Sequence, residues 1–402
     1  MNPDHNTAAT TPPNPWAVLL GLSLGVMVTN GFARFAYGLI LPAMQTDLGW
    51  SYAQAGWLNT ANALGYILGA GFTIWALGRI EAGRLFGVGL VATTVALIAT
   101  GLWAELWWQS LWRFMAGAFG ALSFSTAGVL TARLFADNPR HNALGIAILF
   151  GSGGGVAILL AGATLPALLA VRGDAAWPWA WILVGAISLV CLPLALWAAR
   201  VATPAAAPDP GAAPLPLMRM LPETLGYAAF GLGYIVYLTF LSAWMAERGA
   251  GVVQVALVWV LLGACIALSP FLWRGVFARL SGGAPLAMVL ACIGLGSALP
   301  VIWPGLAGLL ASALVFGASV FMAPGAVTAF TRHNLPPEAW GRAIGVFTLV
   351  FACAQTIGPW GAGWLGDAAG SIGTSLMVAA GVLWAGALVA LLQRPLSRQD
   401  GA

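Results

Sequence analysis

The sequence has very little charge. Only 7% of its 402 residues are charged and 60% are hydrophobic, whereas soluble domains average about 25% charged and about 45–50% apolar residues. Lysine is absent, so all sixteen basic positions are arginine. This composition excludes a soluble fold. The net charge of +4 is not gathered into a basic run interleaved with aromatic residues, so we expect no nucleic-acid partner.

The sequence also lacks the residue clusters that enzymes use. Its four cysteines have no metal-ligand spacing between them. No nucleophile–base pair or metal cluster is recognisable within the apolar segments. We therefore expect no enzymatic activity, no catalytic residue, no metal and no cofactor.

Long apolar runs dominate what is present. Each has about 20 residues or more, enough for a helix to cross a hydrocarbon core of about 30 Å. The runs do not alternate between apolar and polar positions, as β-barrel strands do, which favours an all-α membrane protein. Cutting the chain at charges, prolines and polar clusters predicts twelve transmembrane helices, at 16–42, 52–77, 85–104, 107–132, 143–170, 177–199, 222–245, 251–273, 284–303, 305–330, 343–365 and 371–393.

A segment rich in proline and alanine divides these twelve predicted helices six and six. Both halves carry arginine-containing turns and glycine-rich segments at corresponding places, which indicates duplication and a substrate site where the halves meet. We expect two pseudo-symmetric six-helix bundles joined and flanked by cytoplasmic segments. The predicted parts are an N-terminal tail (1–15), the first bundle (16–199), a linker (200–221), the second bundle (222–393) and a C-terminal tail (394–402).

The arginines also predict an orientation. With the N-terminus inside, twelve of the sixteen fall in cytoplasmic loops, and only Arg172 and Arg248 fall in loops on the other side. The positive-inside rule therefore places both termini in the cytoplasm, for a multi-pass protein of the cell inner membrane. We expect a monomer whose partners are membrane lipid, a small-molecule substrate and protons.

Two segments resemble the major facilitator superfamily (MFS). Residues 31–44, followed by Asp47, Leu48 and Gly49, resemble the YbfB/YjiJ-like bacterial branch, and Arg113 with Gly117 matches the superfamily's Arg-x-x-x-Gly pattern in the fourth helix. The resemblance implies the MFS fold and a transporter that works by alternating access. One departure is Gly78-Arg79, where the superfamily usually has an Asp-Arg pair.

Arg34 and Arg113 are the two arginines predicted to lie within helices, at a similar depth. A guanidinium in lipid costs at least about 2.5–3.5 kcal/mol, so such residues usually line a cavity or contact a partner. The alternative is a structural role, in which Arg113 reaches the interface or holds helices together. Asn30, Arg34 and Tyr37 recur at spacings of four and three, so we expect one helix face to carry all three.

The second half offers neutral groups for the same site. Tyr234 and Tyr237 in the seventh helix and Gln355 in the eleventh are expected to bind substrate together with the first-half residues. Tyrosine hydroxyls would orient the substrate while the rings cover its apolar part. Ordinary packing of these side chains is the alternative.

All twelve acidic residues fall in loops or at the ends of predicted helices. Two interior arginines without an interior acid favour an anionic ligand, because a carboxylate pairs with a guanidinium through two parallel hydrogen bonds. We therefore predict a transporter of a small organic anion, working by exchange or by proton co-transport. Two alternatives stay open: proton-coupled efflux of a hydrophobic or cationic compound, and a non-transporting receptor or lipid-handling protein.

Overall fold

The computed structural model of the chain describes residues 14–77, 79–131, 134–135, 139–202 and 215–396. Every regular element among these residues is a helix. Parts of the predicted tails and linker (1–13, 203–214 and 397–402), together with Arg133, lie outside the described residues.

The first half begins with a helix that changes type twice before it ends. Its first part is α-helical, its middle is a π-helix of nine residues (η1), and its last part is α-helical again. A second, shorter π-helix (η2) interrupts the fifth transmembrane segment. The elements of this half are α1 (Pro15–Val26), η1 (Met27–Phe35), α2 (Tyr37–Leu48), α3 (Tyr52–Ala76), α4 (Ala82–Thr100), α5 (Leu106–Thr131), α6 (Pro139–Ala147), η2 (Ile148–Ser152), α7 (Gly153–Arg172), η3 (Asp174–Ala176) and α8 (Trp177–Val201).

The second half has longer unbroken helices, of which α14 is the longest with 30 residues. Its elements are η4 (Leu217–Met220), α9 (Leu221–Glu247), α10 (Val252–Arg279), α11 (Ala284–Ile302), α12 (Leu306–Gly317), η5 (Val320–Met322), α13 (Ala323–Asn334), η6 (Pro337–Ala339), α14 (Trp340–Ala369) and α15 (Ile372–Leu391).

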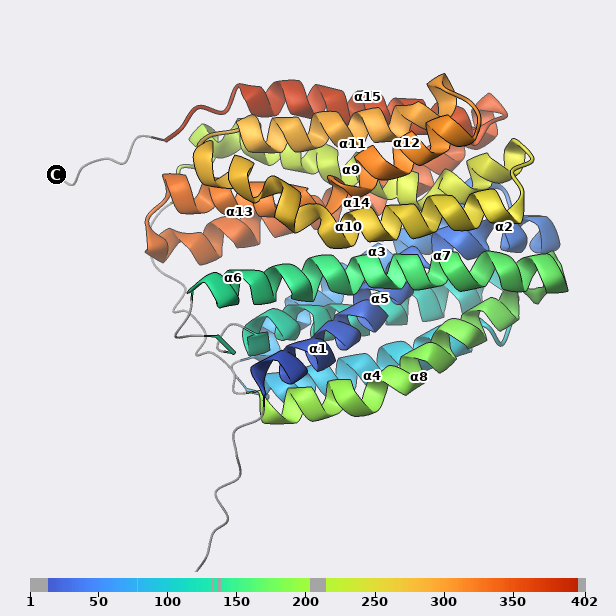
Figure 1. The fold of residues 1–402 in the computed structure, drawn as a ribbon, viewed down its shortest axis with the longest axis horizontal. Helices are drawn as coiled ribbons and strands as arrows, with labels where there is room; N and C mark the ends of the chain where they lie inside the picture. Colours follow the sequence, from blue (N-terminus) through green and yellow to red (C-terminus); the bar gives the residue numbers. More distant parts are fainter. Residues whose placement is uncertain (1–13, 78, 132–133, 136–138, 203–214, 397–402) are drawn as a thin grey trace, which may run out of the picture.

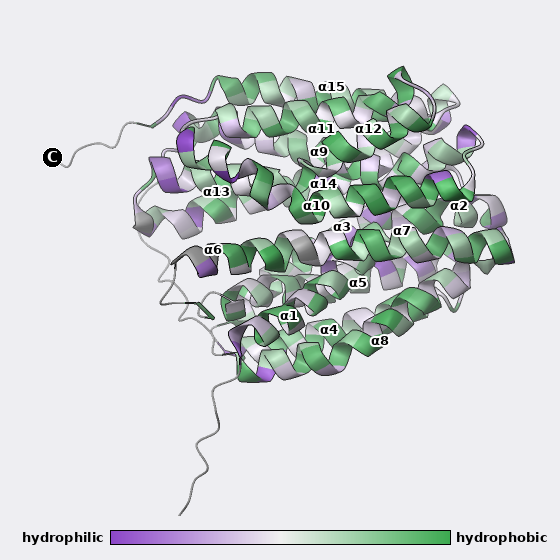
Figure 2. Cartoon of the chain, viewed as in Figure 1, coloured by the Kyte–Doolittle hydropathy of each residue, from purple (hydrophilic) through white to green (hydrophobic). Residues whose placement is uncertain are grey.

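Eleven helical segments, from Pro15–Leu48 to Ile372–Leu391, are long and apolar enough to cross a membrane. The twelfth is α3, whose 25 residues extend about 37 Å at 1.5 Å per residue. Polar residues such as Asn59 and Asn62 make α3 less apolar, but both are buried in the protein. Figure 2 shows hydrophobic residues along the helices and hydrophilic ones gathered at the two ends of the bundle.

The two halves repeat one packing pattern. In the first half, α3 and α4 pack against α5, and α1 and α4 pack against α8; in the second, α10 and α11 pack against α12, and α9 and α11 pack against α15. Between the halves, α3 packs against α14 and α7 against α10, so exchanging the halves exchanges these two contacts. Figure 1 shows the halves as two layers, with α1 beginning and α15 ending at the same end of the bundle. The predicted fold of twelve helices in two pseudo-symmetric bundles is confirmed.

Glycines of the run 151–155 let the two halves approach closely. A Cβ added at Gly155 would lie 2.6 Å from the backbone nitrogen of Ala267 and 2.7 Å from the carbonyl oxygen of Gly263, both in α10. Real Cβ atoms do not approach that closely, so a larger residue would force α7 away from α10. The glycine-rich segment is therefore a packing surface between the halves.

Candidate functional site

Arg34 lies near the end of η1, where the two halves meet. Its Nη2 donates a hydrogen bond to Oε1 of Gln355 in α14, and the hydroxyl of Tyr234 in α9 donates to the same oxygen at 3.0 Å. The guanidinium carbon also lies 5.2 Å from the ring centre of Tyr66 in α3, within range of a cation–π interaction. Three predicted site residues, from three different helical elements, thus come together.

The positive charge of Arg34 has no negative partner here. Its bond to Gln355 is the one hydrogen bond of this guanidinium among the described residues, although an arginine carries five N–H donors. The one salt bridge in the described part of the chain joins Arg84 to Glu81 near the start of α4. Because the Arg34 side chain is only 7% exposed, a buried cation is left with a neutral amide and aromatic rings around it.

Gln355 is also incompletely satisfied. The residue is fully buried, its Oε1 accepts two hydrogen bonds, and its Nε2 has no hydrogen-bond partner. Leaving a buried donor unpaired costs about 1–3 kcal/mol. An added acceptor at this place would therefore satisfy both the guanidinium of Arg34 and the amide of Gln355.

Arg113 lies at the same depth as Arg34 but is hydrogen-bonded to neighbouring helices. Its Nη1 donates to the carbonyl oxygen of Ala33 at 2.6 Å, and its Nη2 donates to Oδ1 of Asn59 at 2.9 Å. The guanidinium also lies 4.9 Å from the ring centre of Tyr37. Since Ala33 directly precedes Arg34, the predicted similarity in depth is confirmed. These contacts join α5 to η1 and α3, which favours the structural alternative for Arg113.

Asn59 and Asn62 complete this connection between helices. Nδ2 of Asn59 donates to Oγ1 of Thr239 in α9 at 2.6 Å, a contact between the two halves. Nδ2 of Asn62 donates to the carbonyl oxygens of Arg113 at 3.0 Å and Ala33 at 3.4 Å. Buried amides on α3 therefore hold α5, η1 and α9 in place around the site.

Besides Arg113, three further predicted site residues make no hydrogen bond to Arg34 among the described residues. The hydroxyl of Tyr37 donates to the carbonyl oxygen of Ala55 at 2.8 Å, and the hydroxyl of Tyr237 pairs with Oγ of Ser312 at 2.7 Å. Asn30 is partly buried and has no hydrogen bond among the described residues. The Tyr37 hydroxyl is therefore bonded to α3 in this structure, and its contact with a substrate stays a prediction.

A column of stacked rings leads from Gln355 along α9; we call Tyr227, Phe230, Tyr234 and Phe351 the aromatic column. Ring centres are 5.6 Å apart for Tyr227 and Phe230 and 4.5 Å apart for Phe230 and Tyr234. The ring of Phe351 in α14 lies 5.4 to 5.6 Å from each of the other three. Stacked rings fix one another's positions, so this column connects the interior of the second half to the site.

Contacts between the halves also close the end of the bundle opposite the start of α1, which we call the distal end. The backbone nitrogens of Tyr52 and Ala53 donate to Oδ1 and Oδ2 of Asp367 in α14, at 2.8 and 2.9 Å. The carboxylate of one half thereby caps the first turn of α3 in the other half, where it also complements the helix dipole. In addition, the Tyr52 hydroxyl donates to Glu247, which accepts from Ser371 at 2.8 Å.

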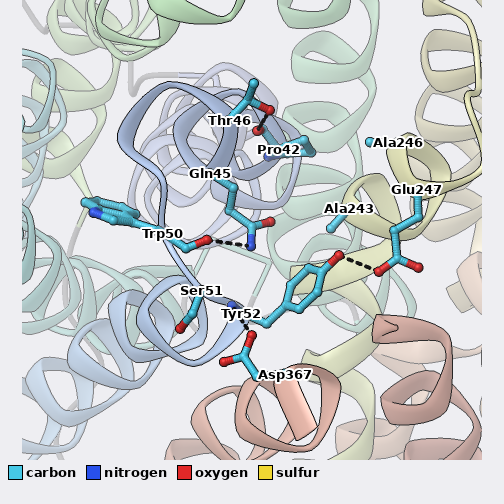
Figure 3. A pocket seen from close by; sticks show the side chains of 10 residues that line it. All are labelled: Pro42, Gln45, Thr46, Trp50, Ser51, Tyr52, Ala243, Ala246, Glu247 and Asp367. Carbon is cyan, nitrogen blue, oxygen red and sulfur yellow. Dashed lines mark hydrogen bonds between the residues drawn. The ribbon is translucent and has the colours of Figure 1, made fainter. Parts of the chain in front are cut away.

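A cavity of about 450 Å³ lies beside these contacts, with Gln45, Thr46, Tyr52, Glu247 and Asp367 among its lining residues. Figure 3 shows the hydroxyl of Tyr52 pointing at the carboxylate of Glu247, and Asp367 below the start of α3. Sequence reasoning placed these acids at helix ends and assigned them no role. The one available signal was that α3 is predicted to begin, and α9 and α14 to end, on the same side of the membrane.

Glu223 is the third residue of α9 and is fully buried. Its predicted place at a helix end is confirmed, but its complete burial there was not predicted. Neither carboxyl oxygen has a hydrogen-bond partner among the described residues. The side chain of Gln393 lies over this end of α9, where its Oε1 accepts from the backbone nitrogen of Glu223 at 3.4 Å and its Nε2 donates to the carbonyl oxygen of Arg219 at 3.0 Å. The position of Glu223 in the sequence did not reveal that Gln393 covers this end of α9.

Two repeated six-helix bundles with buried polar groups between them form the architecture of a secondary membrane transporter. The chain matches the family described as "Uncharacterised MFS-type transporter YbfB" over residues 26–391, and it therefore belongs to this family of the major facilitator superfamily. The resemblance inferred from residues 31–49 is thus confirmed. None of the curated proteins matches the sequence.

Solved structures share the fold at low sequence identity. A bacterial homologue of the human lysosomal transporter Spinster is 15% identical in its inward-facing, unoccupied conformation, with a TM-score of 0.65 over 95% of this chain and 96% of that one. Its inward-facing, occupied conformation gives 16% identity and a TM-score of 0.70 over 94% and 95%. A variant of the nucleoside transporter NupG gives 11% and 0.69 over 93% and 99%. These identities show the fold alone.

Proposed function

We propose that this protein is a secondary active transporter that moves a small organic anion of carboxylate type across the cell inner membrane by alternating access. The observation that carries the substrate class is the guanidinium of Arg34, which is buried between the two halves and has no acidic partner in the described part of the chain. A buried charge without a counter-ion is costly. An anionic substrate would supply the missing negative charge.

The contacts of Arg34 describe how such a substrate would bind. A carboxylate would take the place of Oε1 of Gln355 and accept two parallel hydrogen bonds from the guanidinium. The displaced amide of Gln355 would then donate through Nε2, which lacks an acceptor in this structure. The rings of Tyr66 and Tyr234 would cover the apolar part of the substrate.

The contacts at the distal end support alternating access. They are hydrogen bonds between the two halves, so the halves can separate there while the packing within each bundle stays intact. If both termini are cytoplasmic, as the arginine distribution predicts, the distal end is the outer side and this conformation is closed to the outside. The Spinster homologue that shares the fold is likewise inward-facing. Opening to the outside would require Asp367 and Glu247 to release the start of α3.

Uptake into proteoliposomes tests the proposed substrate class. The purified protein is reconstituted and presented with labelled mono- and dicarboxylates and, separately, with lipophilic cations of similar size. We expect counterflow of at least one carboxylate and none of the cations, and loss of that counterflow in Arg34→Ala. Transport of cations with no response to carboxylates would reject the anion proposal in favour of efflux of cationic compounds.

A further inference from the structure

We propose that Glu223 is a proton-binding site, and that its protonation is coupled to the contact between Arg34 and Gln355. The coupling rests on the proposed anion transport; the proton site itself does not. Together they assign the coupling ion of the transporter and the residue that carries it.

The setting of Glu223 is unusual for an acidic residue. Its side chain has no solvent exposure, and neither Oε1 nor Oε2 accepts a hydrogen bond. It is enclosed where the start of α9 meets the end of α15 and the start of α11: Gly226, one turn further on, packs within 3.2 Å of Leu286 and Gly386 by the position of an added Cβ. These neighbours of Gly226 are apolar carbons and a backbone carbonyl oxygen, none of which can donate a hydrogen bond to a carboxylate.

Charged residues near this end of α9 do not supply a partner either. The elements with most contacts to α9 are α2, α11, α13, α14, α15 and η4, and side chains of α3, α10 and α12 also bond to it. Of these, α3, α11, α12 and α15 contain no charged residue, and Arg274 and Arg279 of α10 are exposed. Asp47 in α2 and Asp367 in α14 lie at the distal end. The remaining charged groups are exposed and none donates to Glu223: Arg219 in η4, Arg332 and His333 in α13, Arg342 in α14 and Arg394 after α15.

The cost of burying a charge decides whether Glu223 is ionised or neutral in this setting. An ionised carboxylate without a partner costs several kcal/mol in a protein interior. The dipole at the start of α9 favours the ionised form by only about 0.3–1 kcal/mol. The neutral acid is therefore the form that fits the closed pocket. The carboxylate would form only when the end of α9 opens to water, so proton release requires a change of conformation.

The sequence of α9 connects this acid to the proposed substrate site. Glu223, Tyr227, Phe230 and Tyr234 follow one another at spacings of four, three and four, so they share one side of the helix. The distance from Glu223 to Tyr234 along the axis is about 16 Å at 1.5 Å per residue. Tyr234 bonds to the Gln355 oxygen that Arg34 also holds.

Substrate binding would therefore shift the rings of the aromatic column. A carboxylate that takes the place of Gln355 on Arg34 moves the acceptor of the Tyr234 hydroxyl, and the rings stacked below Tyr234 must follow. In the proposed cycle one proton binds the Glu223 carboxylate to give the neutral acid as one anion binds Arg34, and both are released on the other side. The transported pair then carries no net charge for a monocarboxylate.

Infrared difference spectroscopy tests the proton site without any substrate. Spectra of the purified full-length protein at acidic and alkaline pH are subtracted, and the carbonyl stretch of a protonated carboxylic acid in an apolar site is followed. We expect a pH-dependent band that is lost in Glu223→Gln, shifted in Glu223→Asp and unchanged in the matched control Glu338→Gln, whose acid is exposed in η6. A band that is the same in wild type and Glu223→Gln overturns the proposal.

Reconstituted vesicles test the coupling. Glu223→Gln should retain counterflow of the anion, which needs no net proton movement, and should lose accumulation driven by a pH gradient together with the accompanying proton flux. Accumulation that persists in Glu223→Gln overturns the coupling. If wild type transports no anion although the infrared band depends on Glu223, the proposed function and the coupling fail and the proton site stands.

Discussion

Replacing Arg34 by alanine should abolish tight binding of the transported anion without unfolding the protein. The guanidinium is buried with a single hydrogen bond and no ion pair. Its removal therefore takes away an uncompensated charge and leaves the Gln355 oxygen with its hydrogen bond from Tyr234. The free energy of unfolding should stay equal to that of wild type or rise.

The loss in affinity follows from the contacts that a carboxylate would exchange. Two charge-assisted hydrogen bonds contribute about 1.5–3 kcal/mol each, and the neutral contact to Gln355 that they replace contributes about 0.5–1.5 kcal/mol. The net loss in Arg34→Ala is about 1.5–5.5 kcal/mol, which corresponds to about 10- to 8,000-fold weaker binding at 1.4 kcal/mol per tenfold change. Arg34→Lys keeps the charge and loses the planar pair of donors, so its affinity for the anion should lie between that of wild type and that of Arg34→Ala.

Isothermal titration calorimetry with the carboxylate that gives the strongest counterflow measures this loss, and thermal unfolding of the unliganded proteins controls for folding. Wild-type affinity in Arg34→Ala, with an unchanged unfolding temperature, would refute the placement of the anion at Arg34. Equal losses in Arg34→Lys and Arg34→Ala would show that the paired geometry matters more than the charge.

Three further predictions concern the contacts around the site. Arg113→Gln leaves Oδ1 of Asn59 without a donor and the carbonyl oxygen of Ala33 with only its 3.4 Å bond from Asn62, and should lower the free energy of unfolding by about 1–3 kcal/mol, measured by chemical denaturation. Asp367→Ala leaves the N-cap Ser51 in place but removes the acceptor of the Tyr52 and Ala53 backbone N–H groups, worth about 1 kcal/mol. It should raise the share of the outward-open conformation about fivefold, measured by spin-label distances across the distal end; an unchanged distribution would contradict a gating role. Gly155→Leu should lower the unfolding temperature because its side chain meets Ala267, whereas Gly71→Leu, in open space, should not.

The transmembrane helices were predictable because hydrophobic length is a local property of the sequence. The second predicted helix, 52–77, corresponds to α3 at Tyr52–Ala76, and the ninth, 284–303, to α11 at Ala284–Ile302. The eighth was predicted to end at 273, but α10 continues to Arg279. A helix can extend beyond the apolar layer into water, so hydropathy marks the membrane and not the end of the helix.

The site was predictable only as a set of polar residues in apolar surroundings. Arg34, Tyr234 and Gln355 were selected for that reason, yet their shared hydrogen bonds join segments far apart in the chain and depend on how the halves meet. The same holds for Asp367 and the start of α3, and for the burial of Glu223 under Gln393. Such contacts are set by tertiary packing, for which a single sequence carries no direct signal.

The π-helix η1 explains why two arginines at one depth differ in their contacts. The change from π-helix to α-helix falls at Ala36, two residues after Arg34. Just before it, the backbone carbonyl of Ala33 accepts from Arg113 and Asn62, while the next side chain, Arg34, reaches across to α14. Arg113 thus fixes the backbone on which Arg34 is mounted. If an anion binds Arg34 as proposed, a guanidinium on a fixed backbone would lose little conformational entropy, and Arg113 would contribute to the affinity without contacting the substrate.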